Sequence, residues 1–399
     1  MSDCEVAIVG GGLVGASLAV AVAGSRHRAV LIEAAQPPQS PASWDERCIA
    51  LNDASRRIFA ALGLWDALRA EAEPILATHI SERGRFGTAR FAAADAKLDA
   101  LGFNVPLRAL GGVLWNALQA RGIEVICPTR VTGLEQRGDQ MELRLDGGRA
   151  LTARLVAAAD GARSAVRELL GIAAETRDYG QHAIVAAVRL ARPHRGVAYE
   201  RFTPEGPLAL IPKPEDAASL VWTVPSDQAP ALLALSDADY LARAQETFGG
   251  RLGRFRELGR RAAHPLARVM SERLTAPRVV LLGNAAQSLH PVAAQGFNLG
   301  LRDVATLAEL LQAGADPGAG EALAEFAARR ARDRERVSGL TDLMVRAFSN
   351  RAPGLAQARH WGLVAVDLVP GLRESVLRQH LGHLGLPRAV IPSPLGGEG

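Results

Sequence analysis

Short apolar runs separated by glycine and polar residues mark the beginning of the chain. Residues 6–9 form one such run, residues 10–15 are rich in glycine, and residues 16–23 are small and apolar. A second apolar run follows at residues 29–32. Short runs of this kind bounded by turn-forming residues are typical of buried strands, and the longer small-residue stretch is typical of a helix. The pattern predicts a strand, a helix and a second strand, which together form a βαβ unit.

Later segments divide into further strands and a helical end. Residues 155–159 and 278–282 are apolar runs that end at polar, glycine-containing turns, so they are predicted to join the first sheet. Three segments, at 183–190, 208–211 and 219–224, are rich in β-forming residues and interrupted by proline and glycine, so they are predicted to form an inserted sheet. The segment at 75–91 is predicted to belong to the same sheet. From residue 322 onward the pattern is mostly helical. Its basic cluster is interpreted as a solvated helix face: Arg329, Arg330, Arg332, Arg334 and Arg336.

These patterns predict an α/β protein with more than one domain. A chain of 399 residues with 48% hydrophobic residues is longer than most single domains and can bury a large core. We expect a Rossmann-like nucleotide-binding domain in three pieces, with an inserted β-sheet domain and a helical C-terminal region. The expected bounds are 1–74, 100–180 and 276–330 for the first, 75–99 and 181–275 for the second, and 331–399 for the third.

Composition and charge narrow the class of protein. A formal charge of +4 is small for this length, so no nucleic-acid partner is expected. The three cysteines lie far apart without a C-x-x-C pair, which predicts neither a disulfide framework nor a metal site. The first residues lack the features of a signal peptide, and no apolar run reaches the roughly 18 residues of a membrane-spanning helix. We expect a cytoplasmic protein, with room for a peripheral contact at the inner face of the membrane.

The turn after the first strand carries a dinucleotide-binding pattern. Gly10, Gly12 and Gly15 fit G-x-G-x-x-G between a predicted strand and a predicted helix. The first glycine allows the tight turn, the second lets a pyrophosphate approach the backbone, and the third lets helix and strand pack closely. The phosphates would lie at the positive end of the helix dipole. Glu33, at the end of the second strand, can accept hydrogen bonds from both ribose hydroxyls of an adenosine, which argues against NADP at this site.

This unit leaves two alternatives open. A plain glycine-rich turn followed by a surface glutamate would contain the same residues, and the motif does not separate FAD from NAD. The choice of cofactor depends on two later segments.

Those two segments resemble a known family. Residues 160–167, D-G-A-R-S-A-V-R, resemble the D-G-x-x-S-x-x-R motif of the FAD-dependent aromatic hydroxylases, the class A flavoprotein monooxygenases; read alone, they also fit a strand-to-helix turn capped by Ser164. Residues 283–300, G-N-A-A-Q-S-L-H-P-V-A-A-Q-G-F-N-L-G, resemble the family's second FAD motif. The resemblance implies FAD as the cofactor, a glutathione-reductase type of FAD-binding domain, and a substrate domain in the inserted sheet. It assigns cofactor contacts to Asp160, Gly161, Asn284, Pro291, Gly296, Phe297 and Asn298.

A helix is predicted to begin near Asn298. Its apolar face recurs at helical spacing and consists of Val304, Leu307, Ala308 and Leu311. The N–H groups of Gly296, Phe297 and Asn298 at its beginning would face the flavin N1 and C2 carbonyl and stabilise the charge of the reduced ring.

Within the family, the chain most resembles the ubiquinone-biosynthesis hydroxylases, among them the 2-polyprenyl-6-methoxyphenol hydroxylases. Asn284 and Gln287 stand where the family usually has Asp and His, a variant that matches this branch. Arg47 resembles an early flavin-contacting arginine, and residues 207–212 and 219–222 resemble the substrate-domain strands. The resemblance also places Arg108 at a cofactor-contacting helix start and Val131 beside the adenine.

The resemblance implies a monooxygenase reaction. NAD(P)H, bound transiently, reduces the FAD, O₂ adds at flavin C4a to give the hydroperoxide, and its distal oxygen passes to the ring of a polyprenylated phenol. His290 is the only histidine placed in the flavin loop to assist proton transfer, and simple hydrogen bonding is its alternative role. Other ubiquinone-biosynthesis proteins are candidate partners.

Because a polyprenyl chain is very apolar, we expect a hydrophobic tunnel and a contact with the membrane or a lipid-carrying complex. The C-terminal apolar residues offer such a surface; the alternative is that they simply pack over the protein core. They are Phe348, Leu355, Trp361, Leu363, Val364, Val366, Leu368 and Val369.

Two other functions stay open at this point. An FAD hydroxylase of a soluble aromatic metabolite would share every cofactor motif. A flavin-binding scaffold within a quinone-biosynthetic complex would also retain the flavin loop.

Overall fold

The first sheet confirms the predicted nucleotide-binding strands. The computed structural model describes residues 3–36, 43–290, 295–348, 355–384 and 386. An eight-stranded sheet has the order β18-β19-β11-β1-β2-β8, with β10 beside β11 and β9 beside β10. Its strands are β1 (Cys4–Val9), β2 (Ala29–Ile32), β8 (Glu124–Ile126), β9 (Val131–Arg137), β10 (Gln140–Leu145), β11 (Ala150–Ala158), β18 (Thr275–Ala276) and β19 (Val279–Leu281). β1 runs parallel to both β2 and β11, so distant segments meet at the carboxyl end of one sheet.

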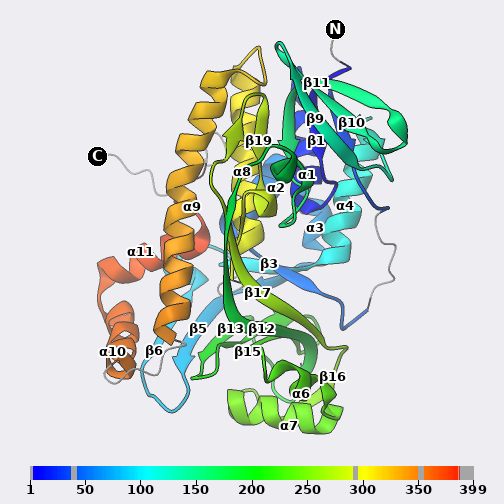
Figure 1. Cartoon of the computed structure of the whole chain (residues 1–399). Helices are drawn as coiled ribbons and strands as arrows, with labels where there is room; N and C mark the ends of the chain where they lie inside the picture. Colours follow the sequence, from blue (N-terminus) through cyan, green and yellow to red (C-terminus); the bar gives the residue numbers. More distant parts are fainter. Residues whose placement is uncertain (1–2, 37–42, 291–294, 349–354, 385, 387–399) are drawn as a thin grey trace.

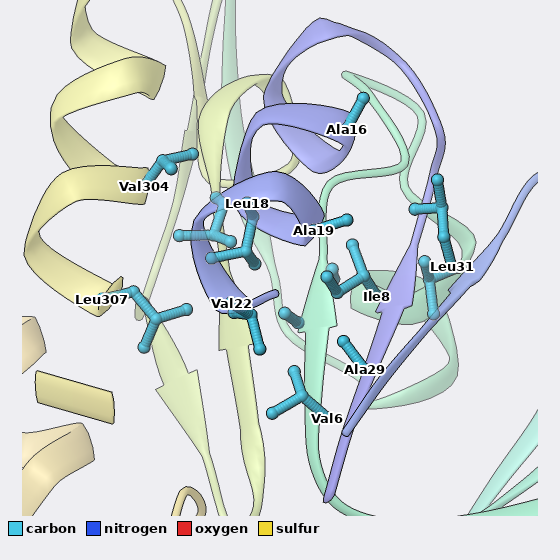
Figure 2. Packing of buried hydrophobic residues seen from close by; sticks show 14 of the residues in the cluster. Val6, Ile8, Ala16, Leu18, Ala19, Val22, Ala29, Leu31, Val304 and Leu307 are labelled. Carbon is cyan, nitrogen blue, oxygen red and sulfur yellow. The ribbon is translucent and has the colours of Figure 1, made fainter. Parts of the chain in front are cut away.

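Helix α1 (Leu13–Val22) lies directly behind this sheet. It begins three residues before the predicted stretch at 16–23, because Gly12 already provides its extended N-cap. Figure 2 shows the buried side chains of α1 between Ile8 of β1 and Leu307 of α8 (Gln295–Ala313). α4 (Leu107–Ala120) packs against the same helix. The interior of this half is almost entirely aliphatic, and its packing fixes where the loops after β1, β11 and β19 emerge.

The second sheet is nine-stranded and lies at the other end of the molecule (Figure 1). Its order is β20-β17-β12-β15-β14-β13-β5-β6, with β16 beside β12. Its strands are β5 (Ala77–Glu82), β6 (Thr88–Ala92), β12 (Ala174–Leu190), β13 (Val197–Phe202), β14 (Leu208–Lys213), β15 (Ala217–Pro225), β16 (Phe255–Leu258), β17 (Ala262–Ser271) and β20 (Gln287–Ser288). The segment at 75–91 thus contributes two strands to this sheet, as expected. α6 (Ala229–Ala234) and α7 (Asp237–Phe248) cover one face, with Trp222, Tyr240 and Phe248 in the core between them.

Smaller elements lie between the two sheets. β3 (Cys48–Asn52), β4 (Glu73–Ile75) and β7 (Gly102–Pro106) form a three-stranded sheet, and α2 (Asp53–Ala61) and α3 (Trp65–Arg69) follow β3. Of the remaining short elements, α5 (Ala165–Leu169) follows β11, η1 (Ala93–Ala96) follows β6, η2 (Asp146–Gly148) joins β10 to β11 within the first sheet, and η3 (Gly283–Ala285) follows β19. The long strands β12 and β17 run from the lower sheet up to the first one (Figure 1). The domain bounds given above remain predictions.

The C-terminal region is helical in the residues described. α9 (Gly320–Phe348) runs along α8, while α10 (Leu355–Leu368) and α11 (Pro370–Leu381) lie beside the edge of the lower sheet (Figure 1). Leu377 and Leu381 of α11 pack on Phe91 and Leu101. Among the described helices, none has both the length and the apolarity needed to cross a bilayer.

The interpretation of the arginine cluster as a solvated face was wrong for two members. Arg332 and Arg336 are exposed and Arg329 is partly exposed, but Arg330 is 1% exposed and Arg334 is 8% exposed. Both buried side chains lie where α9 packs on the rest of the protein. Their charges are balanced there by acidic groups or backbone carbonyls, as burial of a charge requires.

Candidate active site

One cavity of about 690 Å³ joins the two sheets. Its glycine end is formed by Gly12, Arg47, Gly161, Asn284, Gly296, Phe297 and Asn298. Its sheet end is formed by the inner face of the nine-stranded sheet, with Thr78, Ala183, Val185, Ala198, Glu200, Ala209, Val221 and Thr223. The sequence predicted these seven residues as cofactor contacts, and the fold brings them to one place. The same loops also line the cavity with residues that were not predicted, namely Leu13, Val14, Ala159, Ser288, Leu289 and Gln295.

The three motif glycines have different surroundings. A Cβ on Gly10, whose φ is +102°, would come within 2.5 Å of the carbonyl oxygen of Ala159, and one on Gly15 would come within 1.8 Å of that of Gly10. These two positions need glycine because backbone packs against them. A Cβ on Gly12 would have no other atom within 4 Å. It therefore borders open space in the cavity, which is where a pyrophosphate would approach the backbone.

Glu33 ends β2 beside this turn. Its carboxylate accepts hydrogen bonds from the N–H groups of Gly11 and, at 2.8 Å, Ala35. The side chain therefore braces the glycine turn in the described structure, and Glu33 is not part of the described cavity lining. Its contact with a ribose stays a prediction.

The Asp160 segment forms a capped turn. Ser164 is the N-cap of α5 and accepts from the Arg167 N–H at 3.0 Å, as the sequence indicated, while Asp160 accepts from the Ser164 hydroxyl at 2.5 Å and the Val166 N–H at 3.1 Å. Gly161 has a φ of +86° and open space where a Cβ would lie. Arg167 donates to the carbonyls of Ala162 and Ala285 at 2.8 and 2.9 Å. Arg167 thus ties the turn after β11 to the loop after β19.

The loop after β19 is held from behind by Asp303 of α8. One carboxylate oxygen of Asp303 accepts from the Gly283 N–H at 3.0 Å and from the Gln287 amide at 2.9 Å. These contacts use the amide of Gln287 for positioning the loop. The side chain of Asn284 is exposed at the cavity, and no partner for it is found among the described residues. Asn284 is therefore available to a ligand.

The first turn of α8 closes the glycine end. The helix begins at Gln295, three residues before the predicted start near Asn298. The carboxamide oxygen of Asn298 accepts from the Asn52 N–H at 3.0 Å and the Ser55 hydroxyl at 2.6 Å, and its NH₂ group donates to Ala50 at 2.9 Å. The Asn298 side chain thus fixes α8 to β3 and α2. This leaves the backbone N–H groups of the first turn as the donors at the cavity.

A model of the FAD-binding-domain family matches residues 3–338. The chain belongs to this family. It is 40% identical to ubiquinone hydroxylase UbiL of Rhodospirillum rubrum over 98% of this chain and 93% of the relative. It is 34% identical to 3-demethoxyubiquinol 3-hydroxylase of Escherichia coli over 95% of this chain and 98% of the relative. The chain is therefore an FAD-dependent hydroxylase of the ubiquinone-hydroxylase branch, and NAD(P)H as co-substrate is consistent with the family.

Solved structures show the same fold. p-Nitrophenol 4-monooxygenase from Pseudomonas putida has a TM-score of 0.77 at 20% identity and covers 94% of this chain and 98% of its own. Klebsiella pneumoniae HpxO, complexed with FAD and uric acid, has a TM-score of 0.76 at 19% identity and covers 98% of both chains. At these identities the likeness concerns the fold alone.

The glycine end of this FAD-dependent hydroxylase fits the cofactor. The open space at Gly12, the backbone donors of α8 and the available side chains of Arg47 and Asn284 are the features that a pyrophosphate and a ribityl chain need. No carboxylate lies among the lining residues of this end as described, so an anionic group meets no like charge there.

Three other predicted site residues lie away from the described lining, and a fourth, Pro291, is not described. Arg108, at the start of α4, pairs with Glu46 at 3.2 Å and with Glu71. Val131 begins β9, and His290 is buried with its ring edge-on to Tyr179 at 5.2 Å between centroids. Burial lowers the pKa of His290 to about 4, so the ring is neutral near pH 7. Pro291 lies outside the described residues, and the roles of all four stay predictions.

The sequence interpretation missed a buried ionic network behind the loop. Arg302 pairs with Asp333 at 2.7 Å, and Arg330 pairs with Asp303 at 2.7 Å and Asp333 at 2.8 Å. Arg334 adds hydrogen bonds to the carbonyls of Ser271 and Ala286. One signal was present, because Asp303 falls on the apolar face that includes Val304 and Leu307. A charge on such a face indicates a buried partner.

Proposed function

We propose that the chain hydroxylates the aromatic ring of a polyprenylated phenol in ubiquinone biosynthesis, using NAD(P)H and O₂. The observation that carries this proposal is the continuous cavity from Gly12 to the lower sheet, with an apolar wall of Ala183, Val185, Ala209 and Val221. An apolar wall suits a prenylated ring, because it buries hydrocarbon that water would otherwise surround. The names of the relatives, ubiquinone hydroxylase and 3-demethoxyubiquinol 3-hydroxylase, support the same substrate class.

In this proposal the residues of the glycine end hold FAD. Gly12 and the beginning of α1 receive the pyrophosphate, Glu33 the ribose, and Asn284 the ribityl chain. The N–H groups of Gly296, Phe297 and Asn298 would face the flavin ring, and Arg47 would lie beside it. The bound flavin supplies the reductive activation of O₂, and the protein orients the ring and excludes water.

We also propose a peripheral membrane contact at α10 and α11. Trp361 is 62% exposed and Leu368 is 72% exposed, and Val369 and Leu372 lie close to them in the sequence with large exposed areas. Exposed apolar side chains at the edge of the lower sheet would let an apolar substrate enter from a bilayer or a partner protein. Co-sedimentation with anionic vesicles tests this, and a Leu368→Ser, Val369→Ser variant should sediment less. Equal sedimentation would contradict the membrane contact.

Deletion of the gene and mass spectrometry of extracted lipids test the main proposal. We expect a prenylated phenol lacking one hydroxyl to accumulate, with rescue by the wild-type chain and not by Gly12→Asp, which places a carboxylate against the pyrophosphate. Unchanged quinones would contradict the substrate class and favour a soluble aromatic substrate. Rescue by Gly12→Asp, if that variant holds no FAD, would instead favour a scaffold.

A further inference from the structure

Glu200 is an acidic side chain on an apolar wall. It lies on β13, opposite Ala209 of β14 and Ile80 of β5. Ala198, Tyr199 and Glu200 all border the cavity. Side chains alternate along a strand, so Ala198 and Glu200 share one face, while the ring of Tyr199 packs on Phe248 of α7. Glu200 is the only carboxylate in the described lining of the cavity.

The next two strands extend the apolar surroundings of Glu200. Ala209 pairs with Val221 of β15, and Val221 pairs with Val185 of β12. All three line the cavity, and Thr78 of β5 lines it as well. On the same face, β5 also carries Glu82, and β14 carries Lys213, whose ammonium group donates to the Glu46 carbonyl at 2.7 Å; neither lines the cavity. The other cationic or imidazole groups of the described lining are Arg47, His264 and His380, and none of them contributes to the pKa of Glu200.

The carboxylate of Glu200 has no hydrogen-bond or ion-pair partner in the part of the chain that the structure describes. Burial raises the pKa of Glu200 from 4.5 to about 7, with no contribution from a neighbouring charge. The side chain is partly buried, and a carboxylate withdrawn from water without a hydrogen-bond partner loses part of its hydration and gains nothing in return. A ligand that donates a hydrogen bond into the cavity would supply the missing partner.

We infer that Glu200 accepts the hydrogen bond of the substrate's phenolic hydroxyl and takes up its proton during hydroxylation; the inference rests on the proposed function. A phenol is the part of the proposed substrate that has an O–H donor, and the prenyl chain and ring match the apolar neighbours. Glu200 thus orients the ring by one polar contact in an otherwise apolar pocket, as specific ligand sites do.

The proton transfer activates the ring. The phenolic O–H bond breaks, a new O–H bond forms on the Glu200 carboxylate, and the electron pair stays on the phenolate oxygen. That charge raises the electron density at the ortho and para carbons, which is where an electrophilic oxygen is accepted. When aromaticity returns, the ring carbon loses its hydrogen as a proton that neutralises the oxyanion left on the oxygen donor, and Glu200 gives its proton back to the original oxygen.

The environment suits this task. A general base is most effective when its pKa lies near the working pH, because it is then largely ionised and still basic. With a pKa of about 7, Glu200 meets this condition, whereas an ordinary surface glutamate does not. The apolar surroundings of Glu200 therefore make its carboxylate a stronger base than a glutamate in water.

The test compares the FAD-loaded wild type with Glu200→Gln and with a control, Glu257→Gln. Gln has the same shape and cannot take up a proton. Glu257 lies on β16 of the same sheet, with a 60% exposed side chain paired to Arg189. The probe is ortho-prenylphenol, and the readouts are its dissociation constant and the pH profile of kcat/KM. FAD content and the rate of flavin reduction by NAD(P)H show that each variant is folded and loaded.

We expect Glu200→Gln to bind the probe about 10- to 100-fold more weakly above pH 7, as loss of a hydrogen bond to a charged group predicts. The wild-type kcat/KM should fall as pH drops below about 7, and this limb should be absent in Glu200→Gln and present in Glu257→Gln. Wild-type binding and an unchanged pH profile in Glu200→Gln would overturn the inference while leaving the proposed function intact.

Two further outcomes separate the two proposals. If binding of the probe depends on Glu200 but deletion of the gene leaves the quinones unchanged, the role of Glu200 toward phenols stands. The proposal that the substrate belongs to ubiquinone biosynthesis is then wrong. If the wild type binds no phenol, both are contradicted.

Discussion

The two ends of the cavity differ in how their charged side chains are paired. Behind the glycine end, Arg302 and Arg330 are matched by Asp303 and Asp333, with distances of 2.7 to 2.8 Å. At the sheet end, Glu200 faces the cavity without any such partner among the described residues. The first arrangement fixes the geometry of a loop, and the second leaves one group unsatisfied until a ligand arrives. The comparison teaches that the pairing of a buried charge separates a positioning role from a role toward substrate.

The largest expected effect comes from breaking the paired end. Asp303→Asn should lower the free energy of unfolding by about 3–5 kcal/mol, because Arg330 loses a buried partner. It should also weaken FAD binding, since Asp303 holds Gly283 and Gln287 of the loop. Urea unfolding and FAD titration measure the two losses.

A matched surface pair provides the control for that variant. Glu309 pairs with Arg329 at 3.0 Å between the same two helices, with about a third of each side chain exposed. Glu309→Gln should cost less than about 1 kcal/mol, as exposed ion pairs do. Equal losses for the two variants would show that the buried network has no special role.

Removing the charge at the unpaired end should raise the free energy of unfolding, whereas removing Asp303 should lower it. The pKa of Glu200 is raised in the fold, so the unfolded chain is the better acid and stability falls as pH rises from about 4.5 to about 7. Glu200→Gln should therefore match the wild type near pH 4 and exceed its free energy of unfolding by about 2–3 kcal/mol near pH 8. Thermal unfolding of the FAD-free protein across this range is the measurement. A variant less stable than the wild type at pH 8 would mean that Glu200 has a partner in the fold.

Asp53 offers an intermediate case beside the glycine end. Burial alone would raise its pKa, but hydrogen bonding to His383 and the charges of Arg56 and Arg57 outweigh this and lower the pKa to about 2. The stabilisation is present above the ordinary pKa of 3.8 and is lost as pH falls toward 2. Asp53→Asn should cost about 1–2 kcal/mol near pH 7, since its partners are partly exposed, and the difference should narrow below pH 4. Chemical unfolding at several pH values checks this, and a difference that does not vary with pH would contradict it.

Local patterns predicted the glycine end well. The βαβ unit has a clear periodicity, and the residues after β1, β11 and β19 must meet because parallel strands end at one edge. Part of the lower sheet was also predicted from the sequence, since β12, β14 and β15 contain the predicted segments at 183–190, 208–211 and 219–224.

The charged positions were harder to predict. Arg330 and Arg334 look like surface residues on a helix until α8 packs against them. Glu200 lies on β13, a strand that the sequence analysis did not predict. Polar and apolar residues do not alternate regularly there, because Tyr199 and Arg201 lie on the face opposite Glu200. Which face of a strand borders a cavity depends on elements far away in the sequence, so local periodicity does not contain it.

The measurement that tests the central claim most directly uses heavy-isotope O₂. The purified FAD-loaded protein would be supplied with NAD(P)H and a prenylated phenol, and the product analysed by mass spectrometry. We predict a hydroxylated phenol whose new oxygen carries the isotope, because the cavity brings a flavin and an aromatic ring together away from water. Oxidation of NAD(P)H that yields only hydrogen peroxide, with no labelled phenol, would contradict the claim.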